Sequence, residues 1–97
     1  MNPDKMKNKC FEVATIMKAI AHPQRLMIMC YLAEGEKNVG DIFELCEISQ
    51  SQLSQFLNRM HRDKLLKVRK DGQFSFYSIE DKNITQLVKS MQKIFCD

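Results

Sequence analysis

The sequence predicts a mainly α-helical fold with one small β-hairpin, arranged as a single domain over residues 1–97. Apolar residues recur at helical spacing in five separate stretches, which predicts five helices. An Asp71-Gly72 pair, a strong short signal for a hairpin turn, separates two stretches that are rich in β-forming residues. The chain has 97 residues and a hydrophobic content of 44%, which suits a small folded domain. A domain of this size has a thin core, and oligomerisation would strengthen it.

The first helix carries a narrow apolar seam and ends near Ala21. The seam residues follow one another at intervals of 4, 3, 4 and 3, as on a helix that packs against another helix. They are Met6, Cys10, Val13, Met17 and Ile20. Pro23 fits the first turn of a second helix, where its missing N–H costs nothing. This second helix, over about residues 23–33, is apolar almost all round and is therefore expected to be buried on most sides.

The next two helices are close together in the chain and carry capping signals. Asn38 is suited to cap a short third helix over about residues 39–46. Three residues later, Ser49 and Gln52 have the spacing of a capping box at the start of a fourth helix. Two helices joined by a short turn within residues 38–64 predict a helix-turn-helix unit.

The fourth helix has one apolar side and one polar side without charge in its first two turns. The apolar side is expected to be buried, because its members follow the i, i+3, i+4, i+7 spacing. They are Leu53, Phe56, Leu57 and Met60. The other side carries amide and hydroxyl groups, with arginines further along. The residues predicted to contact DNA are Gln50, Ser51, Ser54, Gln55, Asn58, Arg59 and Arg62.

This polar side has the chemistry that reading DNA requires. Amide and hydroxyl groups both donate and accept hydrogen bonds, as the base edges of the major groove do, and Gln and Asn can pair with adenine at two positions. Arg59 and Arg62 are placed for phosphates or guanine. The alternative is a merely soluble helix surface, but exposed helices ordinarily carry Glu and Lys four residues apart. The pattern therefore favours a recognition helix for double-stranded DNA.

The predicted hairpin over residues 66–79 is basic before its turn. Residues 50–79 carry six Lys or Arg against two Asp or Glu, a net charge of +4 in a chain whose total is +3. A positive patch of this kind suits a polyanion partner, so we interpret the hairpin as a wing that grips the DNA backbone. Its predicted contact residues are Arg69, Lys70 and Gln73. A solvated edge hairpin protected by lysines is the alternative.

A last helix is expected over about residues 82–95, with an apolar stripe along one side. The stripe comprises Ile84, Leu87, Val88, Met91, Ile94 and Phe95. No uninterrupted apolar run approaches the roughly 20 residues that a membrane span needs, and residues 1–9 lack the apolar segment of a signal peptide. We therefore expect a cytoplasmic protein without membrane contact, in which the four cysteines are thiols.

Four segments resemble the ArsR/SmtB-type winged helix-turn-helix repressors, and the likeness covers nearly the whole chain in the same order. They are Ala21-His-Pro-Gln-Arg-Leu-Met-Ile28, Val39-Gly-Asp-Ile42, Ser49-Gln-Ser-Gln-Leu-Ser-Gln-Phe-Leu57 and Tyr77. The resemblance implies a homodimer on an inverted-repeat operator, with dimerisation helices at residues 1–21 and 82–97. Two positions depart from the family pattern: Phe56 replaces a common histidine, and Lys64 replaces the glycine that usually closes the recognition helix. We expect Phe56 to add packing and Lys64 to be forced toward a left-handed conformation.

Two cysteines resemble the dithiol of the subgroup that includes BigR, SqrR and HlyU. The resemblance lies in Cys30 within Met29–Leu32 and Cys96 within Ile94–Cys96. It implies a repressor that senses reactive sulfur species or oxidants, forms a sulfur-bridged link and releases operator DNA. A HlyU-like activator that displaces a silencing protein is the alternative. From spacing alone, Cys30 would be a small buried hydrophobe and Cys96 a loose terminal thiol.

Other chemistry is not expected. Asn38 occupies the ligand position of the family's cysteine motif and residues 82–97 contain no histidine, so a metal site is not expected and a metal-responsive repressor is less favoured. No cofactor is expected. The chain has no C-x-x-C pair and no Gly-rich phosphate loop, which argues against an enzyme. A helical interaction module without DNA binding is a further alternative, and Cys10 and Cys46 are interpreted as packing residues.

Overall fold

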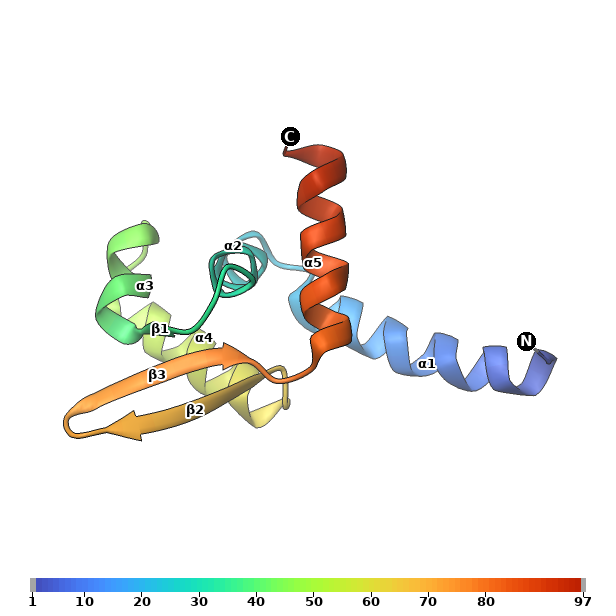
Figure 1. Cartoon of the computed structure of the whole chain (residues 1–97), viewed down its shortest axis with the longest axis horizontal. Coiled ribbons are helices and arrows are strands. Elements are labelled where there is room, and N and C mark those ends of the chain that lie inside the picture. Colours follow the sequence, from blue (N-terminus) through green and yellow to red (C-terminus); the bar gives the residue numbers. More distant parts are fainter. Residues whose placement is uncertain (1, 97) are drawn as a thin grey trace.

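The computed structural model describes residues 2–96, which form five helices and a small antiparallel sheet (Figure 1). In chain order the elements are α1 (Pro3–Ile20), α2 (Pro23–Leu32), β1 (Lys37–Asn38), α3 (Val39–Leu45), α4 (Gln50–Arg62), β2 (Leu66–Asp71), β3 (Phe74–Ile79) and α5 (Lys82–Phe95). The predicted helices and the hairpin are confirmed in type and order. No helix within residues 2–96 is long and apolar enough to cross a membrane.

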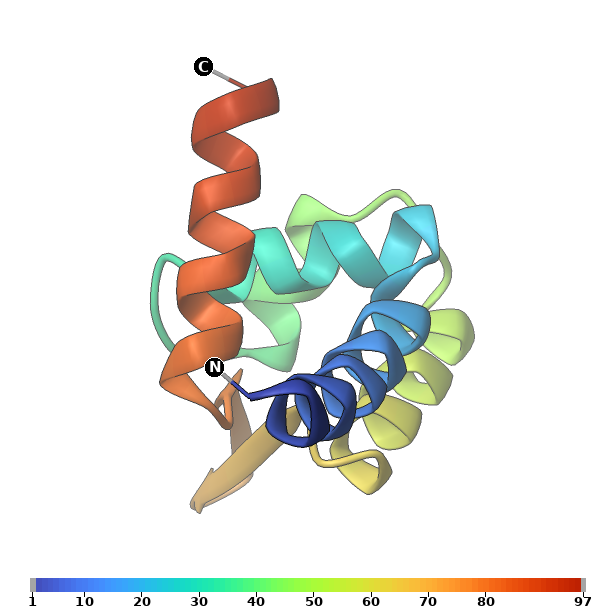
Figure 2. The same ribbon diagram turned by 90° about the vertical axis from the view of Figure 1, so that its right-hand side faces the viewer.

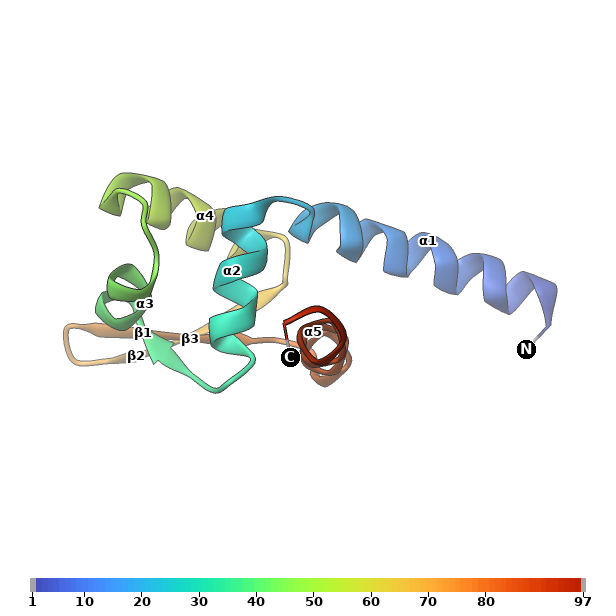
Figure 3. The same cartoon turned by 90° about the horizontal axis from the view of Figure 1, so that it is seen from above.

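Helix α2 lies at the centre of the body because it is apolar on most sides. Seen from above, α3 and α4 lie to one side of it and α5 to the other (Figure 3). The largest fully buried side chains are Ile28, Met29, Ile42, Leu53, Leu57, Met60, Leu66 and Val88. They come from α2, α3, α4, β2 and α5, so a single core holds the helix-turn-helix, the hairpin and the last helix together.

Local hydrogen bonds determine where the two helices of the helix-turn-helix begin. The Asn38 side chain accepts a hydrogen bond from the backbone N–H of Asp41 at 2.8 Å and caps α3. At α4, Ser49 Oγ accepts from the backbone N–H of Gln52 at 3.1 Å, and Gln52 Oε1 accepts from the backbone N–H of Ser49 at 3.1 Å. The predicted capping box is therefore confirmed. It satisfies two backbone donors that would otherwise lack partners at the start of α4.

The sheet contains one strand beyond the predicted hairpin. Strands β2 and β3 pair along their full lengths, and β1 joins the other edge of β3. Lys37 lies opposite Tyr77, and Asn38 lies opposite Phe76. A strand of two residues has no periodicity that a sequence pattern could reveal. Its consequence is that the connection between α2 and α3 is joined to the hairpin.

Helix α1 projects from the body as an arm and leaves most of its apolar seam uncovered (Figure 1). Ile20 is 8% exposed and joins the core, whereas Met6 and Met17 remain 51% and 52% exposed. Helix α5 stands across the direction of α1, as the end-on view of α1 shows (Figure 2). Its last residues, Ile94 and Phe95, are 72% and 78% exposed. The seam of α1 and the end of α5 are therefore open apolar surfaces in a single chain.

Lys64 closes α4 in the left-handed region, with φ at +64°, as its position predicted. Replacing Lys64 with glycine is expected to raise the free energy of unfolding by about 1 kcal/mol, because glycine has no Cβ to oppose this conformation. Chemical denaturation of both proteins measures the change. Lys64→Ala is the control, since alanine keeps the Cβ but removes the charge. An equal gain in both variants would show that the charge and not the backbone was unfavourable.

Candidate nucleic-acid interface and thiol pair

The polar side of α4 is exposed along the helix, because the opposite side is held in the core. Leu53, Leu57 and Met60 are at most 2% exposed. All seven residues predicted on the other side lie on the surface: Gln50, Ser51, Ser54, Gln55, Asn58, Arg59 and Arg62. The first turn of α4 carries no acidic residue. The structure therefore presents a strip of hydrogen-bonding groups that would not repel a polyanion.

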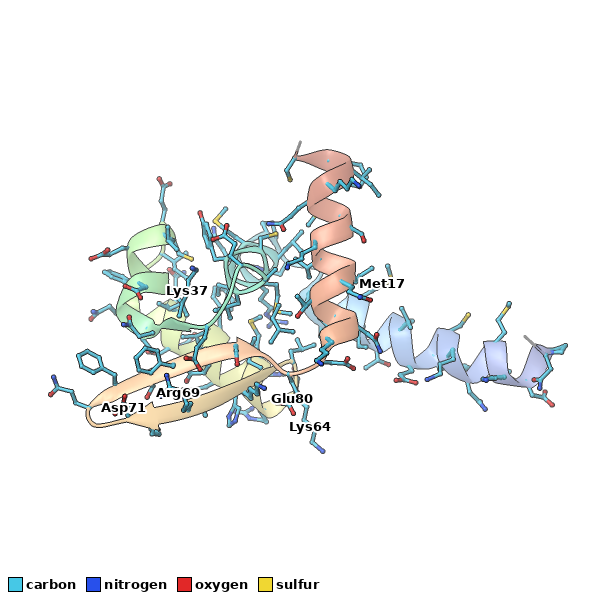
Figure 4. The ribbon with its side chains drawn as sticks, viewed as in Figure 1. Met17, Lys37, Lys64, Arg69, Asp71 and Glu80 are labelled. Carbon is cyan, nitrogen blue, oxygen red and sulfur yellow. The ribbon has the colours of Figure 1, made fainter. Side chains whose placement is uncertain are left out.

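The two arginines of α4 differ in their surroundings. Arg59 Nε donates to Asp63 Oδ2 at 3.1 Å, so this guanidinium is partly neutralised by its neighbour one turn away. Arg62 has no carboxylate partner within the described part of the chain. Lys64 extends from the turn after α4, away from the body (Figure 4). Arg62 and Lys64 are thus the cations near the end of α4 that remain free to meet a phosphate.

Phe56 joins α4 to the start of α2. Its ring is half-buried and lies 5.1 Å from the His22 ring, while the Arg25 guanidinium carbon lies 5.8 Å from its centroid. His22 Nδ1 accepts a hydrogen bond from the backbone N–H of Gln24 at 3.1 Å and caps α2. The expectation that Phe56 adds packing is confirmed. An aromatic ring here supports the orientation of α4 without needing a hydrogen-bond partner.

The three residues predicted on the hairpin are exposed, but Arg69 is engaged with neighbouring side chains. Lys70 and Gln73 lie beside the turn. The Arg69 guanidinium donates to both carboxylate oxygens of Glu36, at 2.8 and 3.2 Å. It also lies 3.8 Å from an oxygen of Asp71 on the same hairpin (Figure 4). The hydrogen bonds from Arg69 hold the pKa of Glu36 below its ordinary value. The structure therefore places Arg69 in a carboxylate pair and leaves Lys70 and Gln73 open to solvent.

The two cysteines predicted to form a sensor lie in the same neighbourhood. Cys30 is half-buried on α2, and Cys96 is exposed directly after α5. Gln92 of α5 approaches Cys30, and its Nε2 donates to the backbone carbonyl of Cys30 at 3.5 Å. Burial raises the pKa of the Cys30 thiol, and the charge of nearby Cys96 raises it further, while a hydrogen bond from Gln92 opposes the rise. Cys96 is therefore the accessible thiol, and Cys30 is the protected one.

The other two cysteines have separate environments. Cys46 is 6% exposed, and burial raises the pKa of its thiol, as expected for a packing residue. Cys10 is exposed on the seam of α1, so it is not packed within a single chain. Across residues 2–96, no three side chains of His, Cys, Asp or Glu form a group suited to a metal ion.

Glu36, Asp63 and Gln92 contact predicted site residues but were not themselves predicted. Asp63 follows Arg59 by four residues, which is the spacing of a helical ion pair and could have been found from the sequence. Glu36 and Arg69 are 33 residues apart, and Gln92 and Cys30 are 62 apart. No local pattern joins residues at such distances, because folding alone brings them together.

Comparison with known proteins supports a regulatory role. Residues 22–68 match the model of the family described as bacterial regulatory protein, arsR family. The chain is 32% identical over 96 residues to the transcriptional activator HlyU of Vibrio cholerae, and this match covers 99% of the chain and 89% of HlyU. The crystal structure of the transcriptional repressor BigR from Xylella fastidiosa has a TM-score of 0.89 at 34% identity and covers 100% of this chain and 99% of BigR. A homodimeric winged helix-turn-helix DNA-binding domain from Mycobacterium bovis has a TM-score of 0.77 at 26% identity. This match covers 96% of the chain and 86% of the Mycobacterium bovis domain.

These likenesses agree with the geometry. The order of helices, the capped helix after a short turn and the hairpin beside it are those of a winged helix-turn-helix. The relatives that share this fold over nearly the whole chain control transcription. The chain therefore belongs to the ArsR family of bacterial regulatory proteins and is a DNA-binding transcriptional regulator, not an enzyme.

Proposed function

We propose that this regulator is a homodimeric repressor that binds an inverted-repeat operator and releases it when reactive sulfur species link Cys30 to Cys96. The DNA-binding surface is supported by the exposed polar side of α4, which is uncharged in its first two turns and lies opposite the buried Leu53, Leu57 and Met60. BigR, which shares the fold at 34% identity, is a transcriptional repressor. The sensing role is supported by the positions of the two thiols, since Cys30 on α2 is near enough to Cys96 after α5 for the charge of Cys96 to raise the pKa of Cys30.

In this proposal α4 enters the major groove and the hairpin contacts the backbone. Ser51, Gln55 and Asn58 lie on the side that would meet base edges, where amides and hydroxyls distinguish base pairs. Arg62 and Lys70 would meet phosphates, which supply affinity that depends on salt but not on sequence. The hydrogen-bonding side of α4 therefore determines which operator is bound, and the cations determine how tightly.

The open apolar surfaces of α1 and α5 supply the proposed dimer interface. Met17 lines an apolar hollow together with Leu87 and Met91 of α5 and lies at the junction of the two helices (Figure 4). Soluble monomers seldom leave contiguous apolar surfaces of this kind uncovered. A second copy related by a two-fold axis would cover the same surfaces on both chains. The homodimeric domain from Mycobacterium bovis supports this arrangement.

The exposed Cys96 is the proposed attacking thiol. Its thiolate attacks the inner sulfur of a polysulfide RS–S–SH, so that one S–S bond breaks, RS⁻ leaves and Cys96 carries –S–SH. The Cys30 thiolate then attacks the sulfur bonded to Cys96, expels HS⁻ and leaves a trisulfide between the two residues. Each step exchanges one S–S bond for another, so no further oxidant is needed. A trisulfide also spans thiols too far apart for a disulfide, which needs Cα atoms within about 7 Å.

Such a link would connect the core helix α2 to the end of the proposed dimerisation helix α5. In a dimer, a change in the angle between these helices would change the spacing of the two recognition helices. Neighbouring major grooves on one side of a duplex lie about 34 Å apart, so a shifted spacing would prevent both helices from binding together. This coupling explains how chemistry at Cys30 would release DNA without touching α4.

A second candidate is an activator of the HlyU kind, which the 32% identity to the transcriptional activator HlyU favours. Both candidates bind DNA through the same surface and differ in what binding does to transcription. Expression of a reporter under the bound promoter, compared between a wild-type and a deletion strain, separates them. Higher expression in the deletion strain supports the repressor, and lower expression supports the activator.

Replacing Gln55 or Arg62 with alanine is expected to weaken operator binding about tenfold or more, since each removes a group on the exposed side of α4. The melting temperature should change little, because neither side chain is buried. Fluorescence anisotropy with labelled duplex and thermal unfolding measure the two effects. Gln86→Ala, an exposed glutamine on α5, is the control and should bind DNA as the wild type does. Unchanged DNA affinity in both test variants would contradict the proposed surface.

Replacing Met17 with aspartate is expected to separate the dimer into folded monomers, because a charge would be buried in the apolar interface. Sedimentation gives the mass, and circular dichroism reports whether the helices remain. Asn8→Asp, on the opposite side of α1, is the matched control and should stay dimeric. A Met17→Asp protein that remained dimeric would show that this part of α1 lies outside the interface.

Replacing Cys30 or Cys96 with serine is expected to leave operator binding intact but insensitive to polysulfide. Mass spectrometry of the treated Cys30→Ser protein should show two added sulfur atoms on Cys96, as a Cys96–S–S–SH group, since the second attack cannot follow. Because burial raises the pKa of Cys30, linking in the wild type should quicken as pH rises past the ordinary thiol range. Cys10→Ser, which removes an exposed thiol elsewhere, should respond normally. Release of DNA by treated double serine protein would exclude this pair as the sensor.

A further inference from the structure

We propose that Arg69 is a positioning residue that clamps the hairpin to the start of the helix-turn-helix through Glu36, and that phosphate contacts by the hairpin come from the unpaired lysines beside it. The DNA-binding part of this inference depends on the proposed function. The clamp itself is a property of the free protein and can be tested without DNA.

Arg69 makes two hydrogen bonds to one carboxylate and contacts one aromatic ring. Its Nη2 donates to Glu36 Oε1 at 2.8 Å and its Nε donates to Glu36 Oε2 at 3.2 Å, so the guanidinium and carboxylate meet through two parallel bonds. The guanidinium carbon also lies 4.5 Å from the centroid of the Phe76 ring. Paired, charge-assisted bonds combined with a ring contact hold a guanidinium in one orientation.

These contacts cross the whole width of the sheet. Phe76 of the central strand β3 lies opposite Arg69 of β2 and opposite Asn38 of β1. Residues that pair across strands share a face, and residues two apart on one strand also share a face. Glu36 lies directly before β1, and its carboxylate meets the Arg69 guanidinium. The ion pair therefore joins β2 to the residue directly before β1, and β3 with Phe76 lies between these two strands.

The clamp joins two functional parts of the molecule. Glu36 belongs to the connection between α2 and α3, directly before the helix-turn-helix begins, whereas Arg69 belongs to the hairpin. Isolated exposed ion pairs contribute little, but this one is bidentate and has Asp71 as a second carboxylate at 3.8 Å. The lowered pKa of Glu36 agrees with a carboxylate that stays ionised in the pair. We infer that the pair determines the angle between hairpin and α4.

The charge of Arg69 is consequently balanced within the protein. Glu36 and Asp71 supply two carboxylates to one guanidinium, so the cluster carries no surplus positive charge for DNA. Lys67 and Lys70 lie on the same strand and form no ion pair within residues 2–96. They are the cations of the hairpin that remain free to meet the backbone.

The test compares Arg69→Ala, Glu36→Ala and the reversed pair E36R/R69E, with Lys70→Ala as the matched control. Hydrogen exchange of the hairpin amides in the free protein is the first measurement. We expect exchange to quicken about fivefold in both single variants and to return toward the wild-type rate in the reversed pair. Lys70→Ala should exchange as the wild type does. Wild-type exchange in Arg69→Ala, or no recovery in the reversed pair, would overturn the clamp.

The salt dependence of DNA binding is the second measurement. Each phosphate contact contributes about 0.9 to the slope of log K against log salt concentration, and a dimer would lose two contacts, a change of about 1.8. Arg69→Ala should weaken binding yet keep the wild-type slope, and the reversed pair should recover affinity. A slope reduced by about 1.8 in Arg69→Ala would make Arg69 a phosphate ligand and contradict the proposal. A wild-type protein that bound no DNA would refute the proposed interface while leaving the exchange result to decide the clamp.

Discussion

The burial of one side of α4 is the constraint on which the rest of the molecule depends. Leu53, Leu57 and Met60 pack into the same core as the central helix α2, and this contact leaves α4 no freedom to rotate about its axis. Burying such side chains contributes about 1.5–3 kcal/mol each, far more than a surface contact could offset. The side with Gln55 and Asn58 must therefore face outward. The capping box at Ser49 adds a defined starting point, so the hydrogen-bonding groups are presented in one register.

The distribution of charge follows from how this core places its neighbours. The basic stretch from α4 through the hairpin has fewer available cations than its composition indicates, because Arg59 pairs with Asp63 and Arg69 pairs with Glu36. Arg62 and Lys70 remain without carboxylate partners within residues 2–96. In the proposed complex, affinity for a polyanion would come from a few such side chains at the edges of the uncharged strip. The interior of the strip is left to groups that recognise shape and hydrogen-bonding pattern.

Much of this architecture could be predicted because the signals are local. Helical spacing, the capping box and the Asp71-Gly72 turn each lie within a few residues, and all appear in the structure as expected. Arg69 shows where prediction from sequence ends, since its carboxylate partner lies 33 residues away and only the paired strands bring them together. The same holds for Cys30, whose environment depends on the far end of α5. The seam of α1 is visible in the sequence as a heptad pattern, and it stays largely uncovered in a single chain.

Operator recognition of the proposed kind requires the amides of α4 to meet base edges in a duplex. Nuclear magnetic resonance of the side-chain NH₂ groups during titration with operator duplex tests it most directly, since every Asn and Gln reports separately. The account predicts that the Gln55 and Asn58 signals shift and show contacts to major-groove protons, while Gln86 on α5 stays unchanged. Tight binding with unshifted Gln55 and Asn58 signals would contradict it, because the duplex would then be held by another surface.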